Sequence, residues 1–269
     1  MQVISSNNNS RKLKMDKVVD VLIVTYNSSR TLKKCLQCIK NAVPYNRIIV
    51  GDGGSNDRTI EIAKHEGAEV YSFPRKDNLI GRIRYKLAEK AEKDWMLYVD
   101  SDVYLYQNFW TIMRCLIRPN VGMAFAVQDS PARTLNTYLT SRKLGFITFG
   151  NTIVPRHLML VCKEMLNLNG GEDVFFAKFV KKRGYEVICL NEHLSFHDKS
   201  EEDLDRKFSR WARELGEEKL LMKFILLELS NIRNMACMTI KDGTISDTSI
   251  LLRRSWKMLS SFIEGLKAP

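Results

Sequence analysis

Residues 95–102 read Trp95-Met96-Leu97-Tyr98-Val99-Asp100-Ser101-Asp102, an apolar run that ends in two acids and a serine. Apolar runs without polar alternation are typical of strands buried on both faces of a sheet. Similar runs occupy residues 18–24, 47–50, 69–73 and 121–127. Because helical patterns separate these runs, the sequence predicts an α/β fold in which a mostly parallel, Rossmann-like sheet is flanked by helices.

Helical spacing is clearest after the first of these runs. Apolar residues there follow the i, i+3, i+4, i+7, i+11 pattern of one helix face, namely Leu32, Cys35, Leu36, Ile39 and Val43. Further helices are expected from Asp57 to Gly67, over 156–168 and over 172–183, with strands at 146–154 and 185–190. After residue 200 the pattern is wholly helical, so we expect a helical C-terminal region at 201–269.

The composition indicates a folded chain with an anionic partner. Its 269 residues are 45% apolar, enough for a large core, and carry a formal net charge of +11. Nucleic acid, a nucleotide diphosphate and an acidic membrane surface would each satisfy that charge. Basic residues alternate with acids along the helical segments, as in 89–93, which is typical of a solvated face. No nucleic acid partner is therefore expected.

Cysteine usage and hydropathy indicate where the protein works. The six cysteines are spread through apolar segments, unlike the dense spacing of a disulfide scaffold, which favours a reducing, cytoplasmic location. Residues 1–17 are polar and basic and lack the apolar stretch of a secretory signal, so we expect a flexible arm there. No window reaches the ~18 uninterrupted apolar residues of a membrane span. Apolar and basic residues mix near the C-terminus, which leaves open a peripheral contact with the inner face of the membrane.

Four polar motifs lie where strands end, and ligands of open α/β sheets bind at that edge. They are Thr25-Tyr26-Asn27, the stretch 50–59 with Asp52 and Asp57, Asp100-Ser101-Asp102, and Gly170-Gly171-Glu172-Asp173 with His197 further on. The second motif is neither a Gly-Lys-Ser/Thr phosphate loop nor a G-x-G-x-x-G fingerprint. Its glycines let the backbone approach a ligand, its first acid can accept hydrogen bonds from a base or ribose, and its second is more typical of a helix cap.

The acids of these motifs have both structural and functional explanations. Asp100 and Asp102 share one face at strand spacing, where a hard divalent cation beside a diphosphate would relieve their repulsion; the alternative is a solvated turn. Glu172 and Asp173 begin a helix, where acids ordinarily complement the helix dipole, and a lone histidine is usually structural. The ordered co-occurrence of all four motifs favours a functional site.

Taken in order, these motifs resemble the inverting family 2 glycosyltransferases with the GT-A fold. The resemblance covers about residues 18–200 and includes the stretch from Gly81 to Arg84. It implies a GT-A catalytic domain at 18–200, with a nucleotide-sugar half at 18–103 and an acceptor half at 104–200, followed by the C-terminal helical appendage. Gly51 departs from the family pattern, in which an apolar residue or Asp is usual.

The resemblance implies a role for each matching residue. Asp173 would be the catalytic base. Mn²⁺ or Mg²⁺ would be held by Asp102, with Asp100 and His197. Glu172 and Asn151 would contact the acceptor. The residues implied in donor binding are Thr25, Tyr26, Asn27, Asp52, Arg84, Asp100 and Ser101.

These roles predict a metal-dependent hexosyltransferase that uses a UDP- or GDP-linked sugar. The expected acceptor is a hydroxyl of a glycan, a lipid-linked glycan or a protein, and a polyprenyl phosphate is the alternative. A nucleotidyltransferase is disfavoured, because no glycine-rich loop with Lys or Arg follows the first strand. A basic protein that binds membrane or nucleic acid without catalysis is the non-enzymatic alternative.

Overall fold

The computed structural model describes residues 18–131, 147–217, 225 and 246–267; the expected arm at 1–17 lies outside them. The chain separates into two compact units. The first holds the described residues of Met1–Ala126 and Ile147–Ser195, and the second those of Val127–Phe146 and Phe196–Pro269.

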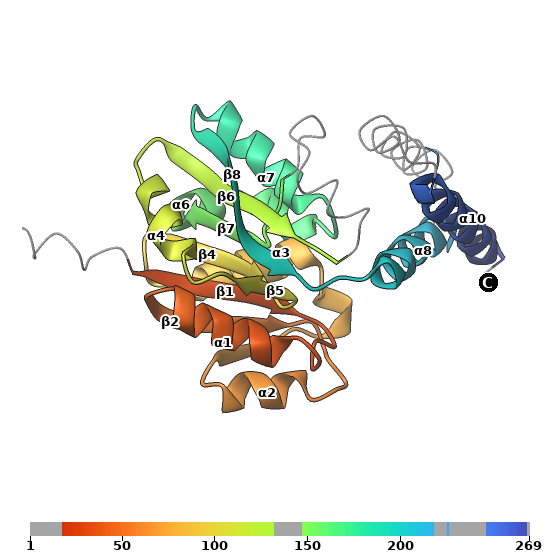
Figure 1. Ribbon diagram of the computed structural model, residues 1–269, viewed down its shortest axis with the longest axis horizontal. Helices are drawn as coiled ribbons and strands as arrows, with labels where there is room; N and C mark the ends of the chain where they lie inside the picture. The colour runs from red at the N-terminus through yellow and green to blue at the C-terminus, as the bar shows by residue number, and fades with distance from the viewer. Residues whose placement is uncertain (1–17, 132–146, 218–224, 226–245, 268–269) are drawn as a thin grey trace, which may run out of the picture. The chain divides into compact units, whose positions relative to one another are not determined.

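An eight-stranded sheet organises the first unit, in the order β3-β2-β1-β4-β7-β6-β8-β5 (Figure 1). Its strands are β1 (Val19–Thr25), β2 (Tyr45–Asp52), β3 (Glu69–Ser72), β4 (Trp95–Asp100), β5 (Val103–Leu105), β6 (Val121–Asp129), β7 (Asn151–Pro155) and β8 (Glu186–His197). The last residues of β6 and β8 belong to the second unit. β1 and β4 are almost entirely buried, as their unbroken apolar runs predict.

The sheet is mixed. β1 pairs in parallel with β2 and with β4, and β2 with β3, whereas β7 runs antiparallel to both β4 and β6. The α/β class and the mostly parallel first half are thereby confirmed, and β7 is the departure. A run such as Ile153-Val154 is equally apolar in either direction, so its hydropathy carries no information on orientation.

The helices of the first unit are α1 (Leu32–Ala42), α2 (Thr59–His65), α3 (Ile80–Lys90), α4 (Phe109–Met113), α6 (Arg156–Val161) and α7 (Glu172–Lys182). α1 packs against α2, and the two lie side by side in Figure 1, while α3 packs against β1 and β2. Right-handed crossovers place α1 and α2 on one face of the sheet and α3 on the other. The reason is that the chain steps from β1 to β3 in one direction along the sheet and from β3 to β4 in the other.

The helix expected over 156–168 is split. α6 ends at Val161, and a 3-10 helix follows at Lys163–Asn167. This segment lies tightly against α3: the Gly81 N–H donates to the Leu168 carbonyl at 2.9 Å, and a Cβ on Gly81 would lie 2.5 Å from the Met165 carbonyl oxygen. Tertiary packing thus replaces a continuous helix here.

Two helices dominate the described part of the second unit, α8 (Glu201–Glu217) and α10 (Ser246–Leu266), as the helical pattern after residue 200 predicts. They pack closely on each other, and Arg254 Nε lies 2.8 Å from Asp205 Oδ1 in a pair that is almost fully buried. Within the described residues, no helix has both the length and the hydropathy to cross a membrane.

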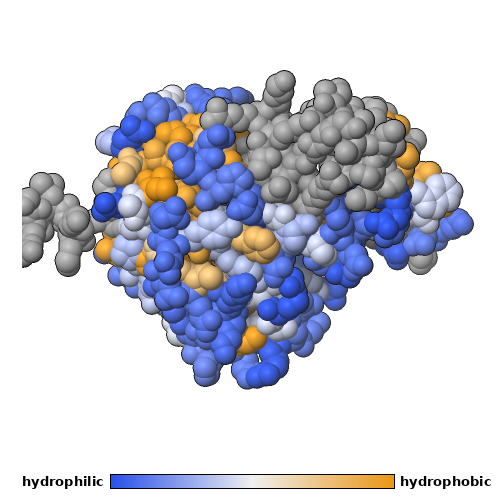
Figure 2. Space-filling model, in the orientation of Figure 1, coloured by the Kyte–Doolittle hydropathy of each residue, from blue (hydrophilic) through white to orange (hydrophobic). Residues whose placement is uncertain are grey.

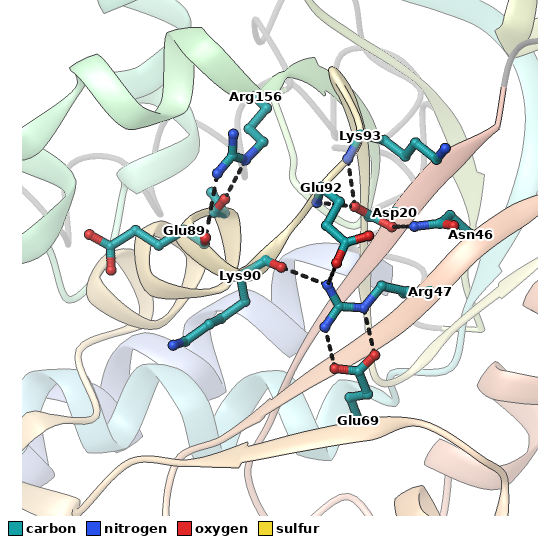
Figure 3. Close-up of polar contacts among 10 residues, drawn as sticks. Asp20, Asn46, Arg47, Glu69, Glu89, Lys90, Glu92, Lys93 and Arg156 are labelled. Carbon is teal, nitrogen blue, oxygen red and sulfur yellow. Dashed lines mark hydrogen bonds and ion pairs between the residues drawn. The ribbon is translucent and has the colours of Figure 1, made fainter.

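A polar cluster lies at the start of β1, β2 and β3 (Figure 3). The buried Asp20 carboxylate accepts hydrogen bonds from the backbone N–H of Glu92 and of Lys93, and from Asn46 Nδ2 at 2.9 Å. Arg47 pairs with Glu69 and with Glu92. The loop between α3 and β4 is thereby fixed to the start of β1 and β2.

We expect Asp20→Ala to lower the free energy of unfolding by about 2–4 kcal/mol, because two backbone N–H groups lose their acceptor. Urea denaturation measures the change. The control is Glu61→Ala, whose pair with Arg58 is exposed to solvent and should contribute little to stability. Equal effects of the two variants would contradict this account of the cluster.

Candidate functional site

The parallel register brings the ends of three strands to one edge of the sheet. Thr25 at the end of β1 is the partner of Asp52 at the end of β2, and Val24 is the partner of Asp100 at the end of β4. Three of the four motifs therefore meet at the carboxyl edge of the sheet. Ligands of open α/β sheets bind at the carboxyl ends of the parallel strands.

Asp52 organises the loop that follows it. The carboxylate is fully buried and accepts hydrogen bonds from the Gly54 and Ser55 N–H groups, both at 2.9 Å, from the Ser55 hydroxyl, and from the Thr25 hydroxyl at 3.2 Å. Its observed contacts hold the shape of the 53–55 turn. A contact to a nucleoside remains a prediction.

Hydrogen bonds join the Thr25-Tyr26-Asn27 turn to the loop that follows β2. Asn27 adopts a left-handed conformation, with φ of 49°, which Asn tolerates better than most residues. Its N–H donates to the Ser55 hydroxyl at 2.8 Å, and its Oδ1 accepts from the Asn56 N–H at 2.9 Å. Tyr26, at 38% exposed, extends from this turn. Its ring is accessible to a ligand.

Asp57 lies one residue before the N-cap position of α2, Arg58, and bonds the first N–H of the helix. It accepts hydrogen bonds from the N–H groups of Thr59 and Ser29, at 3.0 and 3.1 Å. Burial opposes its ionisation, but the hydrogen bonds from Thr59 and Ser29 prevail and lower the pKa of Asp57 to about 2. The carboxylate therefore stays ionised and joins α2 to the turn that precedes α1.

The Asp100-Ser101-Asp102 motif lies between β4 and β5. The Ser101 hydroxyl is 2.8 Å from the hydroxyl of Ser28, which links the motif to the β1 turn. The Cys35 thiol on α1 donates to the Asp100 carbonyl at 3.5 Å. The side chains of Asp100 and Asp102 are partly exposed. These contacts hold Ser101 and the Asp100 backbone in place, and both carboxylates remain accessible.

Arg84 joins this motif to the fourth one. The side chain is 2% exposed; Nη2 lies 2.8 Å from Asp100 Oδ1 and Nε lies 3.3 Å from Glu172 Oε1. The guanidinium also lies 4.8 Å from the Phe149 ring centroid. Burial opposes its charge, but Asp100 and Glu172 prevail and hold the pKa of Arg84 above its ordinary value. Nη1 is buried without a hydrogen-bond partner among the described residues and keeps a donor for a water or a ligand oxygen.

Glu172 and Asp173 open α7 directly after Gly171, whose φ of 65° is left-handed. A glycine takes this conformation without the strain that a Cβ introduces. Glu172 is buried against Arg84, whereas Asp173 is partly exposed. Burial, and then the neighbouring Glu172, raise the pKa of Asp173 to about 6. Asp173 is therefore an acid-base group that changes charge near neutral pH.

Asn151 at the start of β7 is fully buried. Its Oδ1 accepts from the Ala126 N–H at 3.2 Å, and its Nδ2 donates to the Ala126 carbonyl and to the Ser195 hydroxyl. These contacts tie β7 to β6 and β8 and use both donor hydrogens of the amide. They favour a structural role, and acceptor binding by Asn151 stays a prediction.

His197 is the last residue of β8 and belongs to the second unit, so its contribution to a metal site also stays a prediction.

The oxygen donors suit a cation that arrives with a phosphate. Among the described residues, no three His, Cys, Asp or Glu side chains are grouped to hold a metal ion by themselves. Mg²⁺ commonly takes only one or two protein carboxylates and completes its shell with substrate phosphates and water, and Mn²⁺ prefers similar ligands. Asp100 and Asp102 fit that pattern.

Two features of the site were not expected from the sequence. One is the Arg84–Glu172 pair, which joins residues 88 positions apart. The other is the need for glycine at position 51, where a Cβ would lie 2.4 Å from Ile83 Cγ2 on α3. The departure of Gly51 from the family pattern thus reflects the close packing of α3 on β2.

Comparison with known proteins supports the resemblance. The family model described as glycosyl transferase family 2 matches residues 20–160. The glycosyltransferase SunS of Bacillus subtilis is 35% identical over 81 residues, which are 30% of this chain and 19% of SunS. The chain thus aligns with about a fifth of that relative.

Two solved structures share the fold. Staphylococcus aureus TarS 1–349 in complex with UDP has a TM-score of 0.54 at 19% identity, over 74% of this chain and 65% of that one. Glucosyl-3-phosphoglycerate synthase from Mycobacterium tuberculosis, with Mn²⁺, UDP and phosphoglyceric acid, has a TM-score of 0.50 at 17% identity, over 68% of this chain and 71% of that one. These likenesses confirm the GT-A fold.

Arg84→Lys should lower the free energy of unfolding by about 2–4 kcal/mol, because an ammonium cannot reach both carboxylates as the planar guanidinium does. Arg82→Lys, two residues earlier on α3, is the matched control. Arg82 is 28% exposed and pairs with the half-exposed Asp77, so its loss should stay below ~1 kcal/mol. Denaturant titrations that gave equal losses would contradict a central role for Arg84.

Proposed function

Because this chain belongs to glycosyl transferase family 2, we propose that it moves a sugar from a nucleotide diphospho-sugar to an acceptor hydroxyl, with inversion at the anomeric carbon. The observation that carries the proposal is Arg84, which joins Asp100, at the edge where the first three motifs meet, to Glu172 beside Asp173. A transfer reaction needs both a donor site and a base, and Arg84 connects the residues proposed for each.

Donor binding falls to the loops after β1, β2 and β4. Tyr26 offers an exposed ring to the base, and the 53–55 turn, whose shape Asp52 holds, would lie beside the nucleoside. Asp100 and Ser101 would contact the ribose and the diphosphate. UDP accompanies both structural neighbours, so uridine is the first nucleoside to test.

A divalent cation, Mn²⁺ or Mg²⁺, would be held by Asp102 with Asp100 and His197, and would stabilise the negative charge of the leaving nucleotide diphosphate. Arg84 contributes in a different way. Its buried positive charge lies between the carboxylates of Asp100 and Glu172 and offsets their mutual repulsion. The fixed charges are in place before the donor arrives, which is the arrangement that lowers a reorganisation barrier.

Asp173 is the proposed catalytic base. It accepts the proton of the acceptor hydroxyl while the oxygen attacks the anomeric carbon, and the nucleotide diphosphate departs from the opposite face. The pKa of about 6 suits this task, because the group is ionised at neutral pH and is still a useful proton acceptor. Glu172 holds the start of α7 through Arg84 and so fixes Asp173 in position, and a contact between Glu172 and the acceptor stays part of the proposal.

The acceptor hydroxyl belongs to a glycan, a lipid-linked glycan or a protein. An anionic acceptor such as a polyprenyl phosphate is the alternative, and it has no proton to lose. The two are separable, because only a hydroxyl acceptor requires Asp173 as a base.

Donor binding tests the first half of the proposal. Uridine, guanosine and thymidine diphospho-sugars, with and without Mn²⁺, should include one that raises the melting temperature of the full chain in a metal-dependent way. Asp102→Asn should weaken that binding, since a neutral amide replaces a charged ligand of a hard cation. Asp173→Asn should leave donor affinity nearly unchanged and lower turnover by a factor on the order of 10² to 10⁴.

Asp102→Asn and Asp173→Asn serve as controls for each other, since each replaces an aspartate of the proposed site by its isosteric amide. Equal loss of donor binding in both would refute Asp173 as the base. Full turnover of Asp173→Asn, with Asp102 still required, would assign a phosphate acceptor.

The pH dependence gives a separate test. Burial raises the pKa of Asp173 to about 6, so the base becomes protonated and inactive as the pH falls through 6. We expect kcat/KM to decrease about tenfold per pH unit below that value and to be level above it. The residual activity of Asp173→Asn should lack this acid limb, and a limb that persisted in the variant would point to another group.

A further inference from the structure

α10 has one buried face and one exposed apolar face. Arg254, Met258 and Phe262 are buried where α10 packs on α8. Five large apolar side chains on the other face are exposed by 41–72%: Leu252, Trp256, Leu259, Ile263 and Leu266. Their steps of four and three residues place them in one narrow stripe along the helix. Orange surface is visible over the C-terminal helices in Figure 2.

The packing of α8 and α10 fixes this stripe facing outward. Arg254 on α10 pairs with Asp205 at 2.8 Å and with Glu201 at 2.7 Å, both on α8. Lys257 adds a second contact to Asp205 at 2.9 Å. A rotation of α10 that hid the stripe would expose the buried Arg254 contacts and bury charges without partners, at a cost of several kcal/mol.

Positive charge lies along one side of the stripe. Arg253 and Lys267 are exposed, and at 100° per residue they fall on the neighbouring arc of the helix. Lys257 lies on the same arc but pairs with Asp205 of α8. Glu264 shares that arc but pairs with Arg213 of α8. An apolar stripe with Trp and Leu beside a cationic flank is the pattern of a helix that lies in the interface of an anionic bilayer.

A second copy of the chain fits this stripe less well. In a parallel pair of α10 helices, the residues on one side of the stripe face those on the other side of the partner's stripe. One side carries Arg253, Ser260 and Lys267 and the other carries Ser255 and Phe262, so no acid is present to form an ion pair. In an antiparallel pair, Arg253 would face Lys267 of the other copy. Charge complementarity therefore favours an anionic surface over self-association.

We infer that α10 is a membrane-surface site, which binds an anionic lipid bilayer by inserting the Leu252–Leu266 stripe and placing its basic flank against the phosphate headgroups. The helix lies on the membrane and does not cross it, since none of the described helices has the length and hydropathy of a span. The residues involved are separate from the proposed donor, metal and base residues. Vesicle binding and sugar transfer can therefore fail independently.

Co-flotation of the full chain with vesicles tests the inference. Vesicles with about a third phosphatidylglycerol in phosphatidylcholine should bind the protein at low salt, and neutral phosphatidylcholine vesicles should bind it much less. Trp256→Ser should lower the partition coefficient by at least about tenfold. Val161→Ser, which removes an apolar side chain that is 54% exposed on α6, is the matched control and should have no effect.

Two further measurements separate the contribution of the basic side chains from the depth to which Trp256 inserts. Arg253→Gln should weaken binding about fivefold on anionic vesicles only, whereas Arg58→Gln on the other unit should not. Brominated lipids should quench the fluorescence of Trp256, so Trp256→Phe should abolish most of the quenching while binding is retained. Thermal denaturation confirms that each variant is folded.

Three outcomes would overturn the inference. They are absence of binding to anionic vesicles at low salt, equal effects of Trp256→Ser and Val161→Ser, and a concentration-dependent dimer that Trp256→Ser dissociates. The last result would assign the stripe to a second copy of the chain.

Discussion

The buried guanidinium of Arg84 is the contact on which the rest of the site depends. It carries one positive charge between Asp100 at the end of β4 and Glu172 at the start of α7, with the Phe149 ring behind it. Without that charge, three acids would converge at the edge of the sheet, and burial would favour protonation of one of them. The pair of contacts also sets where α7 begins, and with it the position of Asp173.

The parts of the fold that are local in sequence could be predicted, and those that depend on distant contacts could not. Unbroken apolar runs located β1, β2, β4 and β6, because strands buried on both faces need them. No such pattern indicates the direction of β7, and β5 has only three residues, too few for a recognisable apolar run. The helix expected over 156–168 is interrupted because the segment packs on Gly81, a contact invisible in its own periodicity. The same holds for Glu172, whose partner lies 88 residues earlier.

The candidate site shows a further limit of motif reading, since a motif does not separate residues that build a loop from residues that would contact a ligand. Asp52, Asp57 and Asn27 all belong to conspicuous polar motifs, yet their observed hydrogen bonds run within and between the two loops. The loops that these residues hold in shape carry accessible side chains such as Tyr26 and Asp102. The sequence predicts that these motifs lie at one edge of the sheet, and the structure shows which of their side chains hold the loops and which are accessible.

The left-handed turn at Asn27 also bears on how the protein ages. An Asn-Ser dipeptide deamidates when the backbone nitrogen of the serine attacks the side-chain carbonyl of the asparagine and closes a succinimide ring. Here the Ser28 N–H is held by the Thr59 hydroxyl at 2.7 Å, and Asn27 Oδ1 is held by the Asn56 N–H at 2.9 Å. Both reacting groups are engaged in opposite directions, so the hydrogen bonds between the two loops slow spontaneous deamidation of Asn27.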